Sequence, residues 1–87
     1  MPSTAYKTAA GWIASNRHTA TADEDILLSN VGGDTIHFEI TTDDAVPALD
    51  VSQGHPVQPG RSQAMQIKSG ERLWIAGNDV PVTLLVG

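Results

Sequence analysis

The chain has 87 residues, no cysteine and a formal net charge of −5, and only 17% of its residues are charged. These values describe one small domain without disulfides or thiolate metal sites. They also argue against nucleic acid as a partner, because the five Lys and Arg residues are scattered along the chain. No apolar run approaches the length of a membrane span, and the amino end lacks a signal-peptide core, so we expect a protein made in the cytoplasm.

The small size of the chain limits its stability. A chain of this length buries only about 60–65% of the surface that its unfolded form exposes. Small domains gain further stability from disulfides, a metal or oligomerisation. Cysteine is absent, and His18, His37 and His55 lack a metal-ligand spacing. We therefore expect no metal, no cofactor and a homo-oligomer, with a trimer as the favoured order.

The first 22 residues differ from the rest of the chain. They are rich in Ala, Thr and Ser and contain few large apolar side chains. Termini of this composition often become ordered only on a binding partner. We predict an extended amino-terminal arm with a first short strand around AAGWIAS in residues 1–22, followed by a β-domain in residues 23–87.

Regular strand signals begin with the run ILLSNV, which a glycine pair separates from TIHFEITT. In the second run Ile36, Phe38 and Ile40 alternate with polar residues, the two-residue period of a half-buried strand. The glycine pair predicts a tight hairpin between the two runs. A weaker strand is predicted at ALDVS, where Pro47 favours the edge of a sheet.

Turn signals divide the last third of the chain. GHPVQPGR is predicted as a loop with Pro59-Gly60 in a type II turn, followed by a strand at SQAMQIK. Ser69-Gly70 leads into ERLWIA, and GND turns the chain into VPVTLLV. The pattern of six to seven short strands predicts an all-β fold, a small antiparallel β-sandwich or barrel.

Three of the predicted strands are apolar on both faces. The alternation that buries their neighbours leaves Leu27, Trp74 and Leu85 on the face that a monomer exposes. Covering one such side chain stabilises by about 1.5–3 kcal/mol. The expected cover is the amino-terminal segment with Trp12 and Ile13 as a lid, another subunit, or a larger surface. Lone exposed apolar side chains are also common in soluble proteins.

Catalytic and metal-binding chemistry is not indicated by the sequence. The carboxylates at 23–25 and 43–44 lack the ligand pattern of a calcium loop. No serine lies on a glycine elbow, and the glycine pair precedes a strand, whereas phosphate-binding loops lead into a helix. We therefore predict a binding protein and no enzyme.

The candidate interface residues are large aromatic, apolar or arginine side chains, the types that anchor many protein contacts. They are Tyr6, Trp12, Leu27, Arg61, Arg72, Trp74 and Leu85. A sugar-stacking platform built from Tyr6, Trp12 and Trp74 is the alternative use of the same rings. Contact with another protein is the interpretation that we favour.

Four turn and strand motifs follow one another between residues 25 and 87. They are an Asn-x-Gly turn at Asn30 and Gly32, a Pro-Gly loop at Pro59-Gly60, a Gly-Glu-x-Leu-Trp hairpin from Gly70 to Trp74, and a closing valine-rich strand. In this order they resemble small virion proteins of tailed bacteriophages.

The resemblance implies a compact β-sandwich that acts by occupying a site in a particle. It implies a capsid decoration (cement) protein, which binds the major capsid protein on the outer surface of the head and stabilises the shell. The virion would be assembled in the cytoplasm of a bacterial host, with the amino-terminal arm ordered on the shell or on a neighbouring copy. A tail, neck or fibre-base component, or a carbohydrate- or receptor-binding module, is the alternative.

Overall fold

The computed structural model describes residues 3–87 and contains, within them, eight strands and two short 3-10 helices. The strands are β1 (Ser3–Lys7), β2 (Arg17–Thr19), β3 (Glu24–Asn30), β4 (Ile36–Thr41), β5 (His55–Val57), β6 (Ser62–Ile67), β7 (Arg72–Ala76) and β8 (Pro81–Val86). The 3-10 helices are η1 (Ala14–Asn16) and η2 (Val51–Gln53). No helix in this part of the chain is long and apolar enough to cross a membrane.

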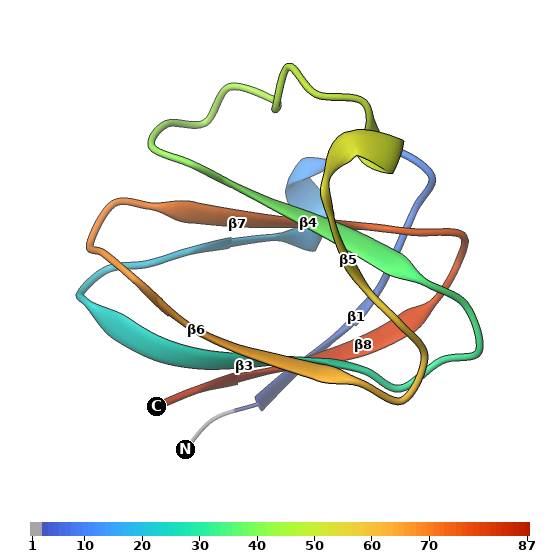
Figure 1. Cartoon of the computed structure of the whole chain (residues 1–87). Coiled ribbons are helices and arrows are strands. Elements are labelled where there is room, and N and C mark those ends of the chain that lie inside the picture. Colours follow the sequence, from blue (N-terminus) through green and yellow to red (C-terminus); the bar gives the residue numbers. More distant parts are fainter. Residues whose placement is uncertain (1–2) are drawn as a thin grey trace.

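The strands form two antiparallel four-stranded sheets that pack face to face (Figure 1). Sheet A has the order β1-β8-β3-β6, and sheet B has the order β2-β7-β4-β5. The pairs β1/β8, β2/β7, β3/β6 and β4/β5 form one long folded hairpin whose pairs enter sheets A and B in turn. This is the topology of the jelly roll. The predicted antiparallel β-sandwich is confirmed, with eight strands in place of six or seven.

The hydrophobic core lies between the two sheets. Alternate residues of each long strand point inward, as the two-residue period predicts. The fully buried apolar side chains between the sheets include Leu28, Ile36, Ile67, Leu73, Ile75, Val82 and Leu84. Buried Asn30 links this core to the loops, because its amide donates to the carbonyl oxygens of Asp34 at 2.7 Å and of Val57 at 2.9 Å.

The amino-terminal segment is not an extended arm. β1 pairs along its whole length with β8, from Ser3 opposite Leu85 to Lys7 opposite Pro81. The buried hydroxyl of Thr8 then accepts the Val80 N–H at 2.8 Å. After η1 the chain enters sheet B as β2, so the first 22 residues supply a strand to each sheet. Residues 1 and 2 of the predicted arm lie outside the described residues.

Two strands were predicted at the wrong place. The first three residues of ALDVS lie in a loop and its last two belong to η2, whereas strand β5 occupies the HPV triplet of the predicted loop GHPVQPGR. The AAGWIAS segment is not a strand either, and β2 begins after it at Arg17. Short edge strands such as β5, which carries Pro56, give a weak sequence signal because proline reduces strand propensity.

The positions of the turns were predicted correctly, but the sequence did not predict which strands and sheets the turns join. Gly60 has φ 75°, and the Arg61 N–H donates to the Gln58 carbonyl at 3.0 Å, which closes the expected turn. The glycine pair at 32–33, however, joins β3 of sheet A to β4 of sheet B. The turn at Ser69-Gly70 likewise joins β6 to β7 across the sandwich. Both connections pass between sheets and close no hairpin.

Candidate functional site

The outer face of sheet B holds three of the predicted contact residues, and the chain itself covers it. Trp74 is only 1% exposed, under Trp12, which is itself 8% exposed. The Trp74 indole N–H donates to the Thr41 hydroxyl at 2.8 Å, and the Trp12 indole N–H donates to the Leu49 carbonyl at 2.9 Å. Trp12 and Trp74 are therefore corrected from interface residues to members of the chain's own packing. Of the expected covers, the amino-terminal segment is the one present over Trp74.

Arg72, the third predicted residue on this face, fastens a loop of the same chain. Its Nε donates to the Asp44 carboxylate at 2.9 Å, and its guanidinium also bonds the carbonyls of Thr42 and Gly70. The Arg17 guanidinium lies 3.5 Å from the same carboxylate and 5.2 Å from the centre of the Trp74 ring. These contacts hold the loop after β4 over sheet B.

Tyr6 points toward the core. It lies opposite Val82 in the register of β1 and β8, and it is half-buried against the main hydrophobic cluster. Burial raises the pKa of its phenol. Because Tyr6, Trp12 and Trp74 are all packed into the molecule, they form no exposed platform for a sugar. That part of the carbohydrate prediction is wrong.

The outer face of sheet A is different, because it is open and lacks charge at its centre. In the strand register Leu85 lies opposite Leu27, and the neighbouring residues extend this row across all four strands. We call the two central rows the neutral face. Its residues are Ser3, Leu85, Leu27 and Ala64 in one row, and Ala5, Thr83, Ser29 and Ser62 in the other.

The chemistry of the neutral face suits contact with another surface. Its two leucines are half-buried beside small side chains, and the Ser29 and Ser62 hydroxyls satisfy one another at 2.8 Å. The nearest charges on this side of sheet A are Lys7 and Asp25, at opposite ends. Small uncharged side chains let a second layer approach closely with little cost of desolvating charge.

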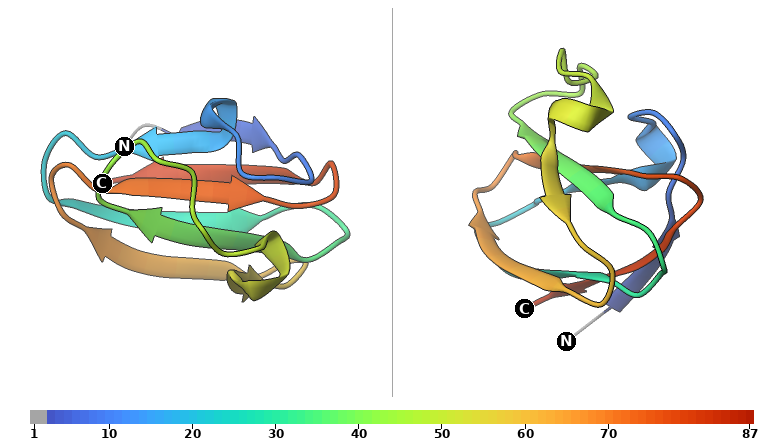
Figure 2. Two further views of the ribbon diagram at one scale, coloured as in Figure 1. Left: turned by 90° about the horizontal axis from the view of Figure 1, so that it is seen from above. Right: turned by 45° about the vertical axis from the view of Figure 1, so that its right-hand side comes forward.

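Arg61 is exposed and lies just before β6, at the edge of sheet A. The predicted residues thus fall into separate places. Leu27 and Leu85 lie together on the neutral face, with Arg61 at its edge. Of the remaining four, Trp12, Arg72 and Trp74 lie at the outer face of sheet B, and Tyr6 lies between the sheets. The two views of Figure 2 show that β6 forms one side of sheet A.

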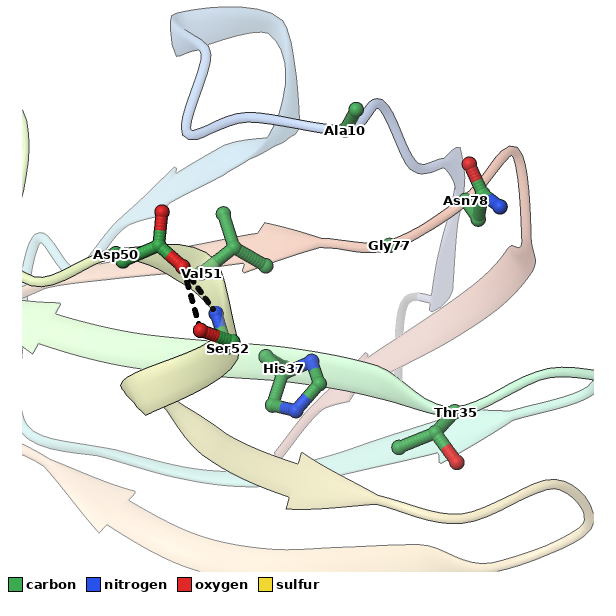
Figure 3. A pocket seen from close by; sticks show the side chains of 8 residues that line it. All are labelled: Ala10, Thr35, His37, Asp50, Val51, Ser52, Gly77 and Asn78. Carbon is green, nitrogen blue, oxygen red and sulfur yellow. Dashed lines mark hydrogen bonds between the residues drawn. The ribbon is translucent and has the colours of Figure 1, made fainter.

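A hollow of about 330 Å³ lies over the outer face of sheet B, beside η2 (Figure 3). Its lining residues come from four segments of the chain and are mostly polar or small. They are Ala10, Thr35, His37, Asp50, Val51, Ser52, Gly77 and Asn78. The volume is near the lower end of the range for small-molecule sites.

Asp50 is the acidic side chain among the residues that line the hollow. The Asp50 carboxylate is engaged by the hydroxyl and the backbone N–H of Ser52, and these bonds hold its pKa below the ordinary value of 3.8. Among the described residues no hydrogen bond joins His37 to Asp50 or Ser52, and no group of three or more His, Asp or Glu could hold a metal ion. The sequence did not predict this hollow, because its lining residues are far apart in the chain.

The small members of the neutral face were also missed. The two-residue period of the strands identified Leu27 and Leu85. Ala5 and Ala64 could not be assigned to this face before the register of β1 and β6 was known.

Comparisons of the chain with protein-family models, with curated proteins and with solved structures give no match. The resemblance to virion proteins therefore stays a prediction from the order of the turn motifs.

Proposed function

We propose that the chain is a structural protein of a bacteriophage virion, a capsid decoration protein that binds the major capsid protein. The neutral face of sheet A is the observation that supports this proposal most directly. It is uncharged at its centre and carries Leu27 and Leu85 side by side, and no other part of the described chain covers it. The opposite face of the sandwich is covered over Trp74 by Trp12 and along Arg72 by the loop after β4.

The energetics fit a protein that acts through many copies. Full cover of a leucine stabilises by about 1.5–3 kcal/mol, and because Leu27 and Leu85 are already partly buried, only about a third of this or less remains available at each. One copy would therefore bind modestly. A protein that binds only the assembled shell adds its binding free energy to that state, and the sum over many copies becomes large.

The fold supports the proposal by analogy alone. Jelly rolls recur among viral capsid domains and lectin domains, and one fold hosts many functions. The topology therefore agrees with a role in a virion, and the neutral face carries the specific argument.

The test compares virions assembled with and without the chain. Under the proposal, particles that lack it lose resistance to heat and osmotic shock, and quantitative mass spectrometry counts hundreds of copies in complete particles. Unchanged particle stability with lost adsorption to cells would contradict the proposal and favour receptor binding. A count of six or twelve copies would move the protein to the tail or neck.

A second candidate function rests on the hollow over sheet B. His37, Asp50, Ser52 and Asn78 present polar groups around a space of about 330 Å³, which suits a small polar ligand such as a sugar. NMR titration with a panel of mono- and oligosaccharides tests this function. It predicts shifts confined to residues of the hollow, and shifts that are absent or spread over the surface would contradict it.

A further inference from the structure

The four edges of the two sheets are protected to different degrees. β2 and β5 have three residues each, and β5 contains Pro56. β1 ends in Lys7. β6 has six residues, SQAMQI, with neither charge nor proline. Because short length, charge and proline are the usual protection against strand pairing, β6 is the unprotected edge of the molecule.

The hydrogen bonds fix which backbone groups of β6 face outward. The Asn30 N–H donates to the Arg61 carbonyl at 2.9 Å, and this pair continues the β3–β6 register. Bonded and non-bonded pairs alternate along an antiparallel ladder. The residues whose N–H and C=O point away from the sheet are therefore Ser62, Ala64 and Gln66. In the single chain the Gln63 side-chain amide donates to the Ala64 carbonyl at 3.1 Å.

We propose that this edge pairs with β6 of a second copy of the chain, antiparallel, about a two-fold axis at Ala64. Ala64 then lies opposite its own counterpart, and Ser62 lies opposite Gln66 of the second copy. The two copies of sheet A become one continuous sheet. A two-fold pair takes the place of the trimer expected from the sequence.

The backbone pattern favours a second copy as the occupant. The outward residues are placed symmetrically about Ala64, so each outward N–H and C=O meets a complementary group of the other copy. The Gln63 amide swings away, and the Ala64 N–H of the second copy replaces it. No other sequence is needed to satisfy this edge.

Charge selects the same register. With Ala64 opposite itself, Arg61 lies opposite Ile67 of the second copy, and Lys68 lies opposite Gly60. A shift that placed Ala64 opposite Met65 would set Arg61 against Lys68, and it would also misalign the backbone groups. Like charges directly opposite one another destabilise a strand pair.

The pairing also extends the neutral face. The row Leu85–Leu27–Ala64 of one copy continues as Ala64–Leu27–Leu85 of the other, so four leucines lie in one line across the joined sheets. A single pair of edge strands buries less area than a standard protein interface, so the association is weak. The inference goes beyond the proposed function, because this pairing needs no capsid and is measured without one.

The first test is sedimentation equilibrium of the purified chain at concentrations up to about 1 mM. The wild type is expected to approach twice the single-chain mass of 9.2 kDa. Ala64→Pro removes the central outward N–H and should give single chains at every concentration. Ala5→Pro is the matched control. The Thr8 N–H donates to the Val80 carbonyl, and the alternation of bonded pairs from there along β1 and β8 leaves the Ala5 N–H pointing away from the sheet. Because β1 is not the pairing edge, the Ala5→Pro variant should still pair.

The second test does not depend on the folding of a proline variant. In the proposed register Gln63 lies opposite Met65 of the second copy in a non-bonded pair, with Cα atoms about 4.5 Å apart, within disulfide range. The double variant Gln63→Cys/Met65→Cys should form cross-linked pairs on mild oxidation, and the two single variants should not. A wild type that stays at 9.2 kDa or forms trimers, an Ala64→Pro chain that still pairs, or an absent cross-link would each overturn the inference.

Discussion

At the scale of single residues, two tryptophans close the outer face of sheet B. Trp12 comes from the segment between β1 and η1, and it packs over Trp74 in the middle of β7. Gly54 makes room for this lid, because a Cβ at that position would lie only 3.0 Å from Cη2 of the Trp12 ring. The lid joins segments that are far apart in the chain.

Removal of the lid should destabilise the protein strongly. Trp12→Ala deletes a side chain that is 8% exposed and leaves a cavity over Trp74, so the free energy of unfolding should fall by about 3–5 kcal/mol. Urea denaturation followed by circular dichroism measures this change. Acrylamide should also quench the fluorescence of Trp74 more strongly.

The neighbouring residue provides the control. Ile13 was predicted to share the lid, but it is 41% exposed. Ile13→Ala should therefore lower the free energy of unfolding by less than about 1 kcal/mol. Equal losses for the two variants would show that Trp12 does not act as the lid.

The sequence identified the face of Trp74 and named the amino-terminal segment as one of three possible covers, but it did not decide between them. Alternation along β7 places Trp74 opposite in direction to Leu73 and Ile75, and the structure confirms this. The contact with Trp12 depends on how a segment without strand period crosses from sheet A to sheet B. No local sequence pattern predicts how this segment crosses between the sheets. For the same reason the first 22 residues were predicted as an extended arm.

At the scale of elements, the turns before β6 and β7 depend on glycine. Gly60 and Gly70 have φ angles of 75° and 88°, a region that other residues enter only with strain. The sequence predicted both turns because proline and glycine carry this signal locally. It did not predict which sheet the next strand joins, since that choice depends on burial between distant strands.

Two glycine substitutions, one at Gly60 and one at Gly33, test whether the turn before β6 requires a positive φ. Gly60→Ala meets open space but must keep a positive φ, so the free energy of unfolding should fall by about 1–2 kcal/mol. Gly33→Ala also meets open space and has no positive φ, so it should be neutral or stabilise by up to about 1 kcal/mol. Thermal denaturation of the two variants measures the difference. A harmless Gly60→Ala would contradict the turn described here.

The helix η2 should make a small part of the stability depend on pH. Asp50 caps η2, and bonds from the Ser52 hydroxyl and backbone lower its pKa below 3.8. A carboxyl group whose pKa is lower in the folded state stabilises that state above its unfolded pKa, and this contribution is lost as the pH falls through the folded value.

Asp50→Asn keeps a capping side chain and removes the charge. The wild type should be the more stable of the two at pH 7, and the difference in melting temperature should shrink as the pH falls below about 4. A difference that stays constant from pH 7 to pH 2 would show that the charge of Asp50 does not contribute.

At the scale of the whole molecule, the two outer faces of the sandwich have opposite characters. Sheet B carries Arg17, Glu39 and Arg72 and is covered by the chain's own tryptophan lid and loop. Sheet A carries the neutral face, which nothing in the described chain covers. The composition of the chain indicated few charges, but only the strand register shows that they are absent from the centre of one face.

The account's central claim is that the neutral face binds the capsid, and the most direct measurement is the binding of purified chain to shells that lack it. The wild type should bind saturably. Leu27→Lys/Leu85→Lys should remain folded by circular dichroism and lose binding at least tenfold. The control Ile13→Lys/Leu49→Lys, which changes two exposed apolar side chains elsewhere, should bind as the wild type does. A wild type that does not bind shells, or a neutral-face variant that binds equally well, would contradict the claim.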